Sequence, residues 1–291
     1  MKIGLLFSSV VHDRLGNAGL FAHLVTTAER CGIESLWTPE HVVIPQHYQS
    51  RYPYAESGKH PTGGDRPILD PFLPLAFAAA LTSKIKLGQA VLILPQHHPL
   101  YIAKQIATLD ILSEGRAMLG AGVGWLKEEY DSLGIDFHCR GARMDESIRA
   151  IRALWRDETC AFSGAHFNFG PLKSLPKPIQ GSRVPIHIGG HSKTAVRRAV
   201  RLADGLFPAG GDPVQWKEML ALMRSECAAI GRNPAEIEIS VAMPELALDD
   251  VKRAEDLGIH RVATLPSGSD RDSLTRSLEG IANNIIARLR E

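Results

Sequence analysis

The 291-residue sequence has few of the features that mark membrane, secreted or metal-binding proteins. No apolar run reaches the roughly 18 residues that are needed to span a bilayer. The four cysteines, Cys31, Cys139, Cys160 and Cys227, are scattered without a Cys-x-x-Cys pair, which argues against a zinc site or a redox dithiol. The first residues, MKIGLLFSSVVHDR, lack a small-residue cleavage site and predict a first strand. We therefore expect a cytoplasmic protein with reduced cysteines.

Charge of one sign is not in excess either. The 33 Lys and Arg residues against 32 Asp and Glu give a net charge of +1, so nucleic acid and anionic membrane surfaces are not expected partners. The candidate site residues include no cluster of carboxylates and no histidines at metal spacing, which argues against hydrolysis by a metal or by paired acids. We expect a small-molecule substrate and no metal.

The chain does contain a repeated pattern, in which a short apolar run is followed by a helical period, eight times in all. The strands are predicted at 2–8, 33–38, 86–94, 116–121, 184–188, 205–208, 237–242 and 261–265, and the main helices at 18–31, 72–82, 98–112, 144–155, 192–203, 213–230, 249–257 and 272–289. Eight alternations without a break in composition predict one (β/α)₈ barrel over residues 1–291, with a doubly wound open sheet as the alternative. Residues 157–184 break the period and predict a hairpin and loop inserted after strand 4.

In such a barrel, chemistry gathers where the strands end and the helices begin. The ends expected to converge are Ser8–Ser9, Glu40–His41, Ala90–Val91, Gly122–Trp125, Gly189–Ser192, Ala209–Gly211, Pro244 and Pro266–Gly268. The long polar segment 39–70 is predicted to be either functional or disordered. Trp37 and Trp125 lie at strand ends where a flat ligand could meet them, whereas Trp155 and Trp216 are predicted to pack on helices.

The stretch RAMLGAGVGWLKEEY, residues 116–130, carries glycine at every second position: Gly120, Gly122 and Gly124. Bare backbone of this kind allows a flat ligand or a facing strand to approach closely. The pattern alone favours the second explanation, room for a neighbouring strand or a tight turn.

The best anion site in the sequence is Gly189 to Ser192, directly before a predicted helix. Gly189 and Gly190 leave the backbone exposed, and His191 and Ser192 open a helix whose N-terminal amides can hold a phosphate. The alternative is an ordinary capped helix with Ser192 as its N-cap. We favour the phosphate site because two glycines accompany the cap.

Two further sets of polar residues are compatible with either a functional or a structural role. His41 directly follows Glu40, and its imidazole can donate a hydrogen bond, accept a proton or stack beside a ring; a loop histidine satisfied by backbone groups is equally compatible with the sequence. A second group could clamp a substrate, but we expect its members to pair with each other at a helix start: Arg140, Arg143, Asp145 and Glu146.

Several segments together resemble the luciferase-like monooxygenase family, in particular the branch that uses the 5-deazaflavin coenzyme F420. The matching segments are WTPEH (37–41), LGQAVLILPQHHP (87–99), SEGRAMLGAGVGWLKEEY (113–130), RGARMDESIRAIRALW (140–155) and IHIGGHSKTAVRRAVRLADGLFP (186–208). They span most of the chain in the order that the family has.

The resemblance implies a (β/α)₈ barrel with an insertion after strand 4 and a non-proline cis peptide at Ala90–Val91, forming a bulge against the coenzyme ring. It places His41 near the reactive edge of the ring, and we expect Glu40 to orient it. The implied cofactor-binding residues are Ala90, Val91, Gly122, Gly124, Trp125, Gly189, Gly190, His191 and Ser192.

The implied activity is hydride transfer between F420 and a small organic substrate, with segment 39–70 closing over the site. The alternatives are a reduced-flavin monooxygenase that uses FMN and oxygen, and a non-catalytic cofactor-binding paralogue. Val123 replaces an arginine of bacterial luciferase, which weakens the case for the terminal phosphate of FMN. Trp125 replaces an acid of the sugar-phosphate dehydrogenases, so glucose 6-phosphate is not expected as the substrate. Barrels of this family often pair, so we expect a homodimer.

Overall fold

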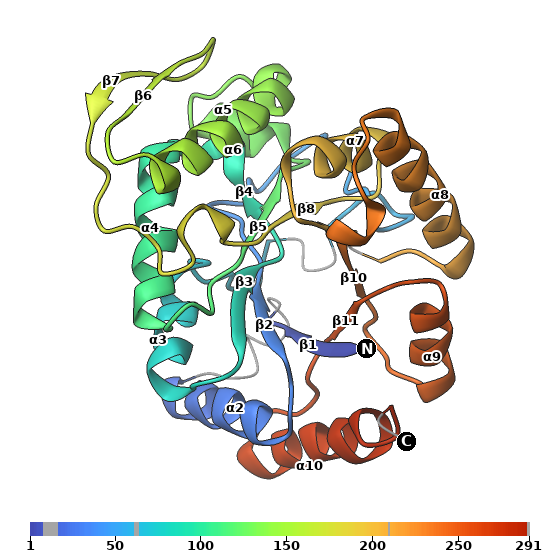
Figure 1. Ribbon diagram of the computed structural model, residues 1–291. Coiled ribbons are helices and arrows are strands. Elements are labelled where there is room, and N and C mark those ends of the chain that lie inside the picture. The colour runs from blue at the N-terminus through green and yellow to red at the C-terminus, as the bar shows by residue number, and fades with distance from the viewer. Residues whose placement is uncertain (8–16, 61–63, 209, 290–291) are drawn as a thin grey trace.

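The computed structural model describes residues 1–7, 17–60, 64–208 and 210–289, and its parallel strands surround a common axis with helices outside them (Figure 1). The strands are β1 (Lys2–Leu6), β2 (Ser35–Thr38), β3 (Lys86–Gln89), β4 (Leu92–Ile93), β5 (Leu119–Gly122), β8 (Ile186–Gly189), β9 (Gly205–Phe207), β10 (Glu238–Ala242) and β11 (Arg261–Thr264). Their order is β3-β2-β1-β11-β10-β9-β8-β5-β4.

The two ends of this order, β3 and β4, are successive parts of one barrel strand. Only Ala90 and Val91 separate them, and the peptide bond between these two residues is cis, as predicted. β3 pairs with β2 on one side, β4 pairs with β5 on the other, and the Met118 amide donates to the Leu87 carbonyl at 2.8 Å. The sheet therefore closes on itself, which confirms the barrel and excludes an open sheet.

The outer layer consists of helices whose apolar faces cover the strands. Their bounds are α2 (Ala18–Arg30), α3 (Leu73–Leu81), α4 (Pro99–Leu112), α5 (Lys127–Ser132), α6 (Arg140–Arg156), α7 (Lys193–Leu202), α8 (Pro213–Ala229), α9 (Leu248–Asp256) and α10 (Arg271–Ile281), which continues into a π-helical turn at Ala282–Ile286. Asn17, Asp212 and Asp270 cap helices with side-chain oxygens. Trp155 and Trp216 are buried, as predicted.

The insertion lies between α6 and β8 and contains the antiparallel hairpin of β6 (Cys160–Ser163) and β7 (Asn168–Leu172). It projects beyond the helix layer (Figure 1). The Glu146 carboxylate accepts hydrogen bonds from the backbone amides of residues 165–167, which fixes the hairpin turn to α6. The predicted insertion after strand 4 is thereby confirmed.

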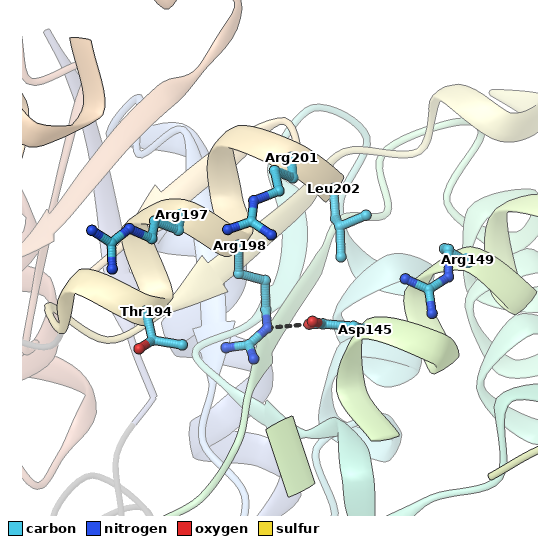
Figure 2. A pocket seen from close by; sticks show the side chains of 7 residues that line it. All are labelled: Asp145, Arg149, Thr194, Arg197, Arg198, Arg201 and Leu202. Atoms are coloured by element: carbon cyan, nitrogen blue, oxygen red, sulfur yellow. Dashed lines mark hydrogen bonds and ion pairs between the residues drawn. The ribbon is translucent and has the colours of Figure 1, made fainter. Parts of the chain in front are cut away.

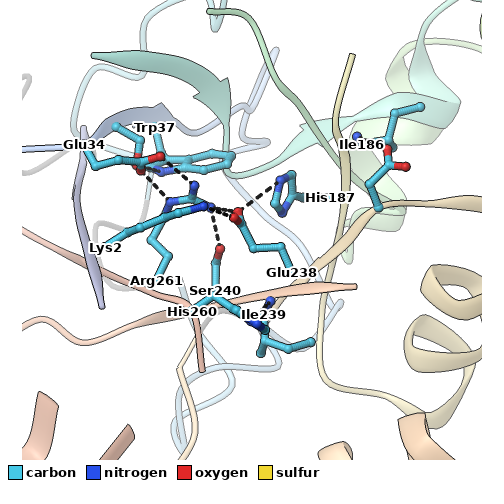
Figure 3. Close-up of polar contacts among 12 residues, drawn as sticks. Lys2, Glu34, Trp37, Ile186, His187, Glu238, Ile239, Ser240, His260 and Arg261 are labelled. Carbon is cyan, nitrogen blue, oxygen red and sulfur yellow. Dashed lines mark hydrogen bonds and ion pairs between the residues drawn. The ribbon is translucent and has the colours of Figure 1, made fainter. Parts of the chain in front are cut away.

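A buried ion cluster fills the amino-terminal end of the barrel (Figure 3). Arg261 donates to both Glu34 and Glu238, and its guanidinium lies 5.3 Å from the centroid of the Trp37 ring. Trp37 is fully buried above this cluster and contacts Phe207 edge-on at 4.9 Å. The prediction that Trp37 meets a flat ligand is wrong, because its side chain points into a packed layer. The carboxyl-terminal mouth is where the candidate site lies.

Candidate functional site

Neighbouring strand ends meet at one side of the mouth. Ile93 of β4 pairs with Gly122 of β5, and β5 pairs with β8. The Ala90–Val91 bulge stands immediately before β4, so residues predicted from strands 3, 4 and 5 come together. Two other predicted ends, Ser8–Ser9 and Ala209, lie outside the described residues.

Val91 is the central side chain at this side of the mouth. We call Val91, with Ala90 before it and Gly122 and Gly189 beside it, the Val91 surface. A Cβ atom at Gly189 would lie 2.5 Å from Val91 Cγ1, and one at Gly122 would collide with Cγ2. Both glycines therefore make room for Val91. Gly122 is itself buried, so it supports the surface from beneath and does not offer open backbone as the sequence suggested. Gly120 makes room in the same way for the carbonyl oxygen of Gln89.

Gly124 turns the chain away from β5. Its φ of +68° is in the left-handed region, where a side chain is strained, and a Cβ atom there would lie 2.8 Å from Ile93 Cγ2. Trp125 follows directly and is partly buried. The glycine-rich stretch thus combines room for the bulge with a tight turn that presents Trp125 to the mouth.

The start of α7 has the form of an anion site. Gly190 has a φ of +102°, and the Ser192 hydroxyl caps the helix by accepting from the Ala195 amide at 3.1 Å. Within the described part of the chain, the amides of Lys193 and Thr194 have no hydrogen-bond acceptor. Free amides and the positive end of the helix dipole favour a phosphate at this position.

His41 uses both of its ring nitrogens. Nδ1 lies 3.0 Å from the Glu129 carboxylate, and Nε2 lies 3.3 Å from the Trp125 indole nitrogen. An indole N–H only donates, so Nε2 is the acceptor and the proton of the neutral ring is on Nδ1, shared with Glu129. Glu129 is buried and also accepts from the amides of Val42 and Val43. It fixes both the ring and the chain after it.

Glu40 does not orient His41, which corrects the expectation from the sequence. Its buried carboxylate lies 2.7 Å from His97 Nε2 and accepts from the Ile93 amide at 2.5 Å. It therefore joins the end of β2 to β4, directly after the bulge. Consecutive residues on extended chain point to opposite sides, which explains why Glu40 and His41 have different partners.

Aromatic side chains of the segment that follows His41 pack against Trp125. The rings of Tyr48, Tyr52 and His60 lie 5.5, 5.2 and 6.3 Å from the Trp125 ring. Burial lowers the pKa of His60 to about 4, and the charge that His41 would carry when protonated acts in the same direction. Burial raises the pKa of Tyr52 to about 12. Both side chains are neutral at pH 7, so this part of the mouth is aromatic and uncharged.

The same segment reaches the loop of residues 189–192, before α7. Tyr54 contacts His191 edge-on at 5.5 Å between ring centroids. The segment is also tied to α5, because the Glu128 carboxylate accepts hydrogen bonds from the Ser50 hydroxyl at 2.7 Å and from the Gln49 amide at 2.7 Å. Partial burial opposes ionisation of Glu128, but these hydrogen bonds prevail and lower its pKa to about 2. Adjacent glutamates of α5 thus hold the segment at two places.

The polar residues at the start of α6 do not pair with each other, so that prediction is wrong. Arg143 donates to the Pro95 carbonyl, and Arg140 lies over the Phe137 ring. Asp145 pairs with Arg198 of α7. Each side chain reaches a different neighbouring element, since residues this close on a helix point in different directions.

The described residues contain no group of three or more His, Cys, Asp or Glu side chains that could hold a metal ion. Over the same residues, no helix combines the length and the apolar character that a membrane crossing requires.

The model of the luciferase-like monooxygenase family matches residues 1–279. An uncharacterized protein of Mycobacterium tuberculosis is 32% identical over 275 residues, which cover 91% of this chain and 94% of that protein. An F420-dependent glucose-6-phosphate dehydrogenase of Kineococcus radiotolerans is 28% identical over 238 residues, 80% of this chain and 65% of that protein.

Solved structures share the fold. An F420-dependent secondary alcohol dehydrogenase in complex with an F420-acetone adduct has a TM-score of 0.76 at 15% identity, covering 98% of both chains. A diketocamphane monooxygenase of Pseudomonas putida in complex with FMN has a TM-score of 0.71 at 18% identity, covering 99% of this chain and 98% of that one. The family match over residues 1–279 and the 32% identical relative show that this chain, a closed barrel, belongs to the luciferase-like monooxygenase family of oxidoreductases.

Proposed function

We propose that this protein transfers a hydride between coenzyme F420 and a small organic substrate. The observation that carries the proposal is the Val91 surface, a partly exposed bulge held between Gly122 and Gly189 at the barrel mouth. The start of α7 is joined to this surface through Gly189. A ring on the bulge and a phosphate at Ser192 would thus be held by consecutive parts of β8 and α7.

The residues present fit such a coenzyme in shape and in charge. Val91 offers an apolar face, and the free amides at the start of α7 offer donors to a phosphate. Bound F420 would supply the carbon that takes or gives the hydride. The protein would supply orientation through Val91 and Gly190, and exclusion of water through the aromatic segment on Trp125.

His41 is the group that we assign to proton transfer. Its Nε2 is the acceptor nitrogen, and it would hold the proton that the substrate loses or gains as the hydride moves. The Trp125 indole donates a hydrogen bond to this nitrogen. This hydrogen bond must break before the nitrogen can exchange a proton with a substrate. Glu129 keeps the other proton on Nδ1 throughout. Trp125 thus covers the base when no substrate is in place.

A reduced-flavin monooxygenase is the second candidate, and a monooxygenase of the same fold with bound FMN supports it. Two observations favour F420. The relative from Kineococcus radiotolerans is F420-dependent, and the resemblance to bacterial luciferase implies an arginine for the flavin phosphate where this chain has Val123. The same resemblance implies an acid of the glucose-6-phosphate dehydrogenases where this chain has Trp125, so we propose a substrate other than glucose 6-phosphate.

A homodimer in the cytoplasm is part of the same proposal. Exposed apolar side chains on α3 and α4, including Leu73, Phe77 and Tyr101, would be covered by a second copy. The molar mass in solution, measured by light scattering after gel filtration, tests it: twice 31.8 kDa is expected, and 31.8 kDa would contradict it.

Parallel titrations test the choice of coenzyme. Purified protein should bind F420 at one equivalent per chain, with weaker binding of FMN. With F420 present, a panel of alcohols and carbonyl compounds should include one that changes the coenzyme absorbance without consuming oxygen. Tight FMN binding with oxygen-dependent turnover would overturn the proposal, and binding of F420 without any turnover would favour the non-catalytic paralogue.

A further inference from the structure

A cavity of about 300 Å³ lies between α6 and α7, in the helix layer outside the barrel (Figure 2). Its lining is basic, with four arginines against one carboxylate. The lining residues are Asp145, Arg149, Thr194, Arg197, Arg198, Arg201 and Leu202. Thr194 is shared with the proposed phosphate site, which uses its backbone amide, whereas its side chain faces this cavity. The other lining residues belong neither to the Val91 surface nor to the contacts of His41, so most of the cavity lies outside the barrel mouth.

Helical spacing builds both walls. On α7 the lining residues recur at 194, 197, 198 and 201, which places them on one face of the helix. On α6 the lining residues are Asp145 and Arg149, four positions apart and therefore also on one face. Figure 2 shows the α7 arginines and Arg149 on opposite sides of the cavity. The basic lining is a consequence of which helix faces oppose each other.

Two of the arginines are neutralised by the protein. Arg198 is buried and pairs with Asp145, and its guanidinium also donates to the Gly141 carbonyl. Arg197 pairs with Glu226 of α8 at 2.7 Å. These pairs direct the Arg197 and Arg198 side chains towards α8 and α6.

The other two arginines have no such partner. Within the described residues, the side chains of Arg149 and Arg201 make no hydrogen bond and no ion pair. Both side chains are exposed, so water and salt screen their mutual repulsion, and an anion that enters between them gains from both charges. A guanidinium binds phosphate and carboxylate groups through two parallel hydrogen bonds.

We propose that this cavity binds a small polyanion that carries at least two acidic groups, phosphate or carboxylate. Arg149 and Arg201 supply the charge from the two walls, and the Thr194 hydroxyl supplies a further donor. A volume of about 300 Å³ exceeds that of a single inorganic ion and reaches the lower end of ligand pockets. The site does not depend on the identity of the coenzyme at the mouth.

Calorimetric titration of the full chain with pyrophosphate and, separately, with citrate tests the proposal. We expect at least one of the two probes to bind saturably at one equivalent per chain. In the double variant Arg149→Gln/Arg201→Gln its affinity should fall at least tenfold. In Arg149→Lys/Arg201→Lys, which keeps the charge but loses the planar fork, the affinity should fall by less. Thermal unfolding of each variant checks that the chain still folds.

The matched control is Arg224→Gln/Lys252→Gln, which removes the same charge from exposed positions on α8 and α9 outside the cavity lining. It should retain wild-type affinity. The proposal is overturned when neither probe binds. It is also overturned when Arg149→Gln/Arg201→Gln and the control Arg224→Gln/Lys252→Gln lose affinity equally. Affinity that survives Arg149→Gln/Arg201→Gln would also overturn it, because the anion would then bind elsewhere, for example at Ser192.

Discussion

His41 is held between Glu129 and Trp125, and the proposed function makes its Nε2 the proton-transfer group. Replacement His41→Ala removes this group but leaves the Val91 surface intact. We expect kcat to fall by about 10² to 10⁴ with nearly unchanged affinity for F420. Stopped-flow absorbance of the coenzyme measures both. His47→Ala, at an exposed position of the same segment, is the control and should keep full activity.

Glu129 is predicted to set the tautomer of His41. In Glu129→Gln the amide oxygen still accepts from the amides of Val42 and Val43, but the NH₂ group cannot accept from Nδ1–H. The imidazole should therefore lose its Nδ1–H tautomer, which ¹⁵N NMR of the histidine ring reports directly, and kcat should fall at least tenfold.

Glu128→Gln is the matched control for Glu129→Gln, because Glu128 contacts Ser50 and Gln49 but not His41. It should leave the tautomer as it is in the wild type. An unchanged imidazole spectrum in Glu129→Gln would remove Glu129 from the positioning role.

At the residue scale, the sequence predicted that His41, Trp125 and the Gly189–Ser192 loop follow strand ends, which the structure confirms, and their roles towards a coenzyme stay proposals. It missed Glu129. The signal was present as an acidic pair opening a short helix, but the contact with His41 spans 88 residues of chain and no local spacing reveals it. The sequence also favoured Glu40 as the partner of His41, since adjacency along the chain does not place two side chains on the same side.

Among the elements, the join of β4, β5 and β8 depends on glycine. In Gly189→Ala the new methyl group would collide with Val91 Cγ1, only 2.5 Å away, and one of the two must move. Crowding of this kind costs about 1 to 3 kcal/mol, and we expect a comparable loss in the free energy of F420 binding, measured by titration.

Gly170→Ala, in the hairpin strand β7, adds the same methyl group where nothing lies within 4 Å. It should bind the coenzyme as the wild type does. Full F420 affinity in Gly189→Ala would show that the coenzyme does not rest on the Val91 surface.

Element positions were largely predictable, because apolar runs and helical periods alternate throughout the chain. The division of strand 3 into β3 and β4 came only from the family resemblance, since LGQAVLIL reads as one uninterrupted strand. The packing of segment 39–60 on Trp125 was not predictable in detail, because ring contacts between distant residues leave no periodic trace. Its closure over a substrate stays a proposal.

For the whole molecule, the buried histidine of the barrel interior predicts how stability depends on pH. Burial, reinforced by the charge of Arg261, lowers the pKa of His187 from 6.5 to about 4. The unfolded chain therefore binds more protons than the folded chain between these values. Stability from His187 is fully present above about pH 6.5 and is lost as the pH falls towards 4, by up to about 3 kcal/mol.

Urea unfolding at a series of pH values measures this dependence. His187→Gln should flatten the slope of unfolding free energy against pH between about 6.5 and 4.5, whatever its absolute stability. His47→Gln, at an exposed position, should keep the wild-type slope. Equal slopes in His187→Gln and the wild type would contradict the assignment.

At this scale, the eight strand-and-helix repeats of the sequence predicted the barrel, but they did not predict which side chains fill its interior. Trp37 was expected at the mouth, yet it lies in a buried layer above the pairing of Arg261 with Glu34 and Glu238. Which side chains point inward depends on the register of strands that are far apart in the sequence.

The central claim is that the Val91 surface and the start of α7 hold one coenzyme at the barrel mouth. A crystal structure of the protein with F420 tests it most directly. We predict the ring of the coenzyme against Ala90 and Val91, with a phosphate at the amides that follow Ser192. A coenzyme bound away from the bulge, or no density at the mouth from crystals that contain F420 at saturating concentration, would contradict the account.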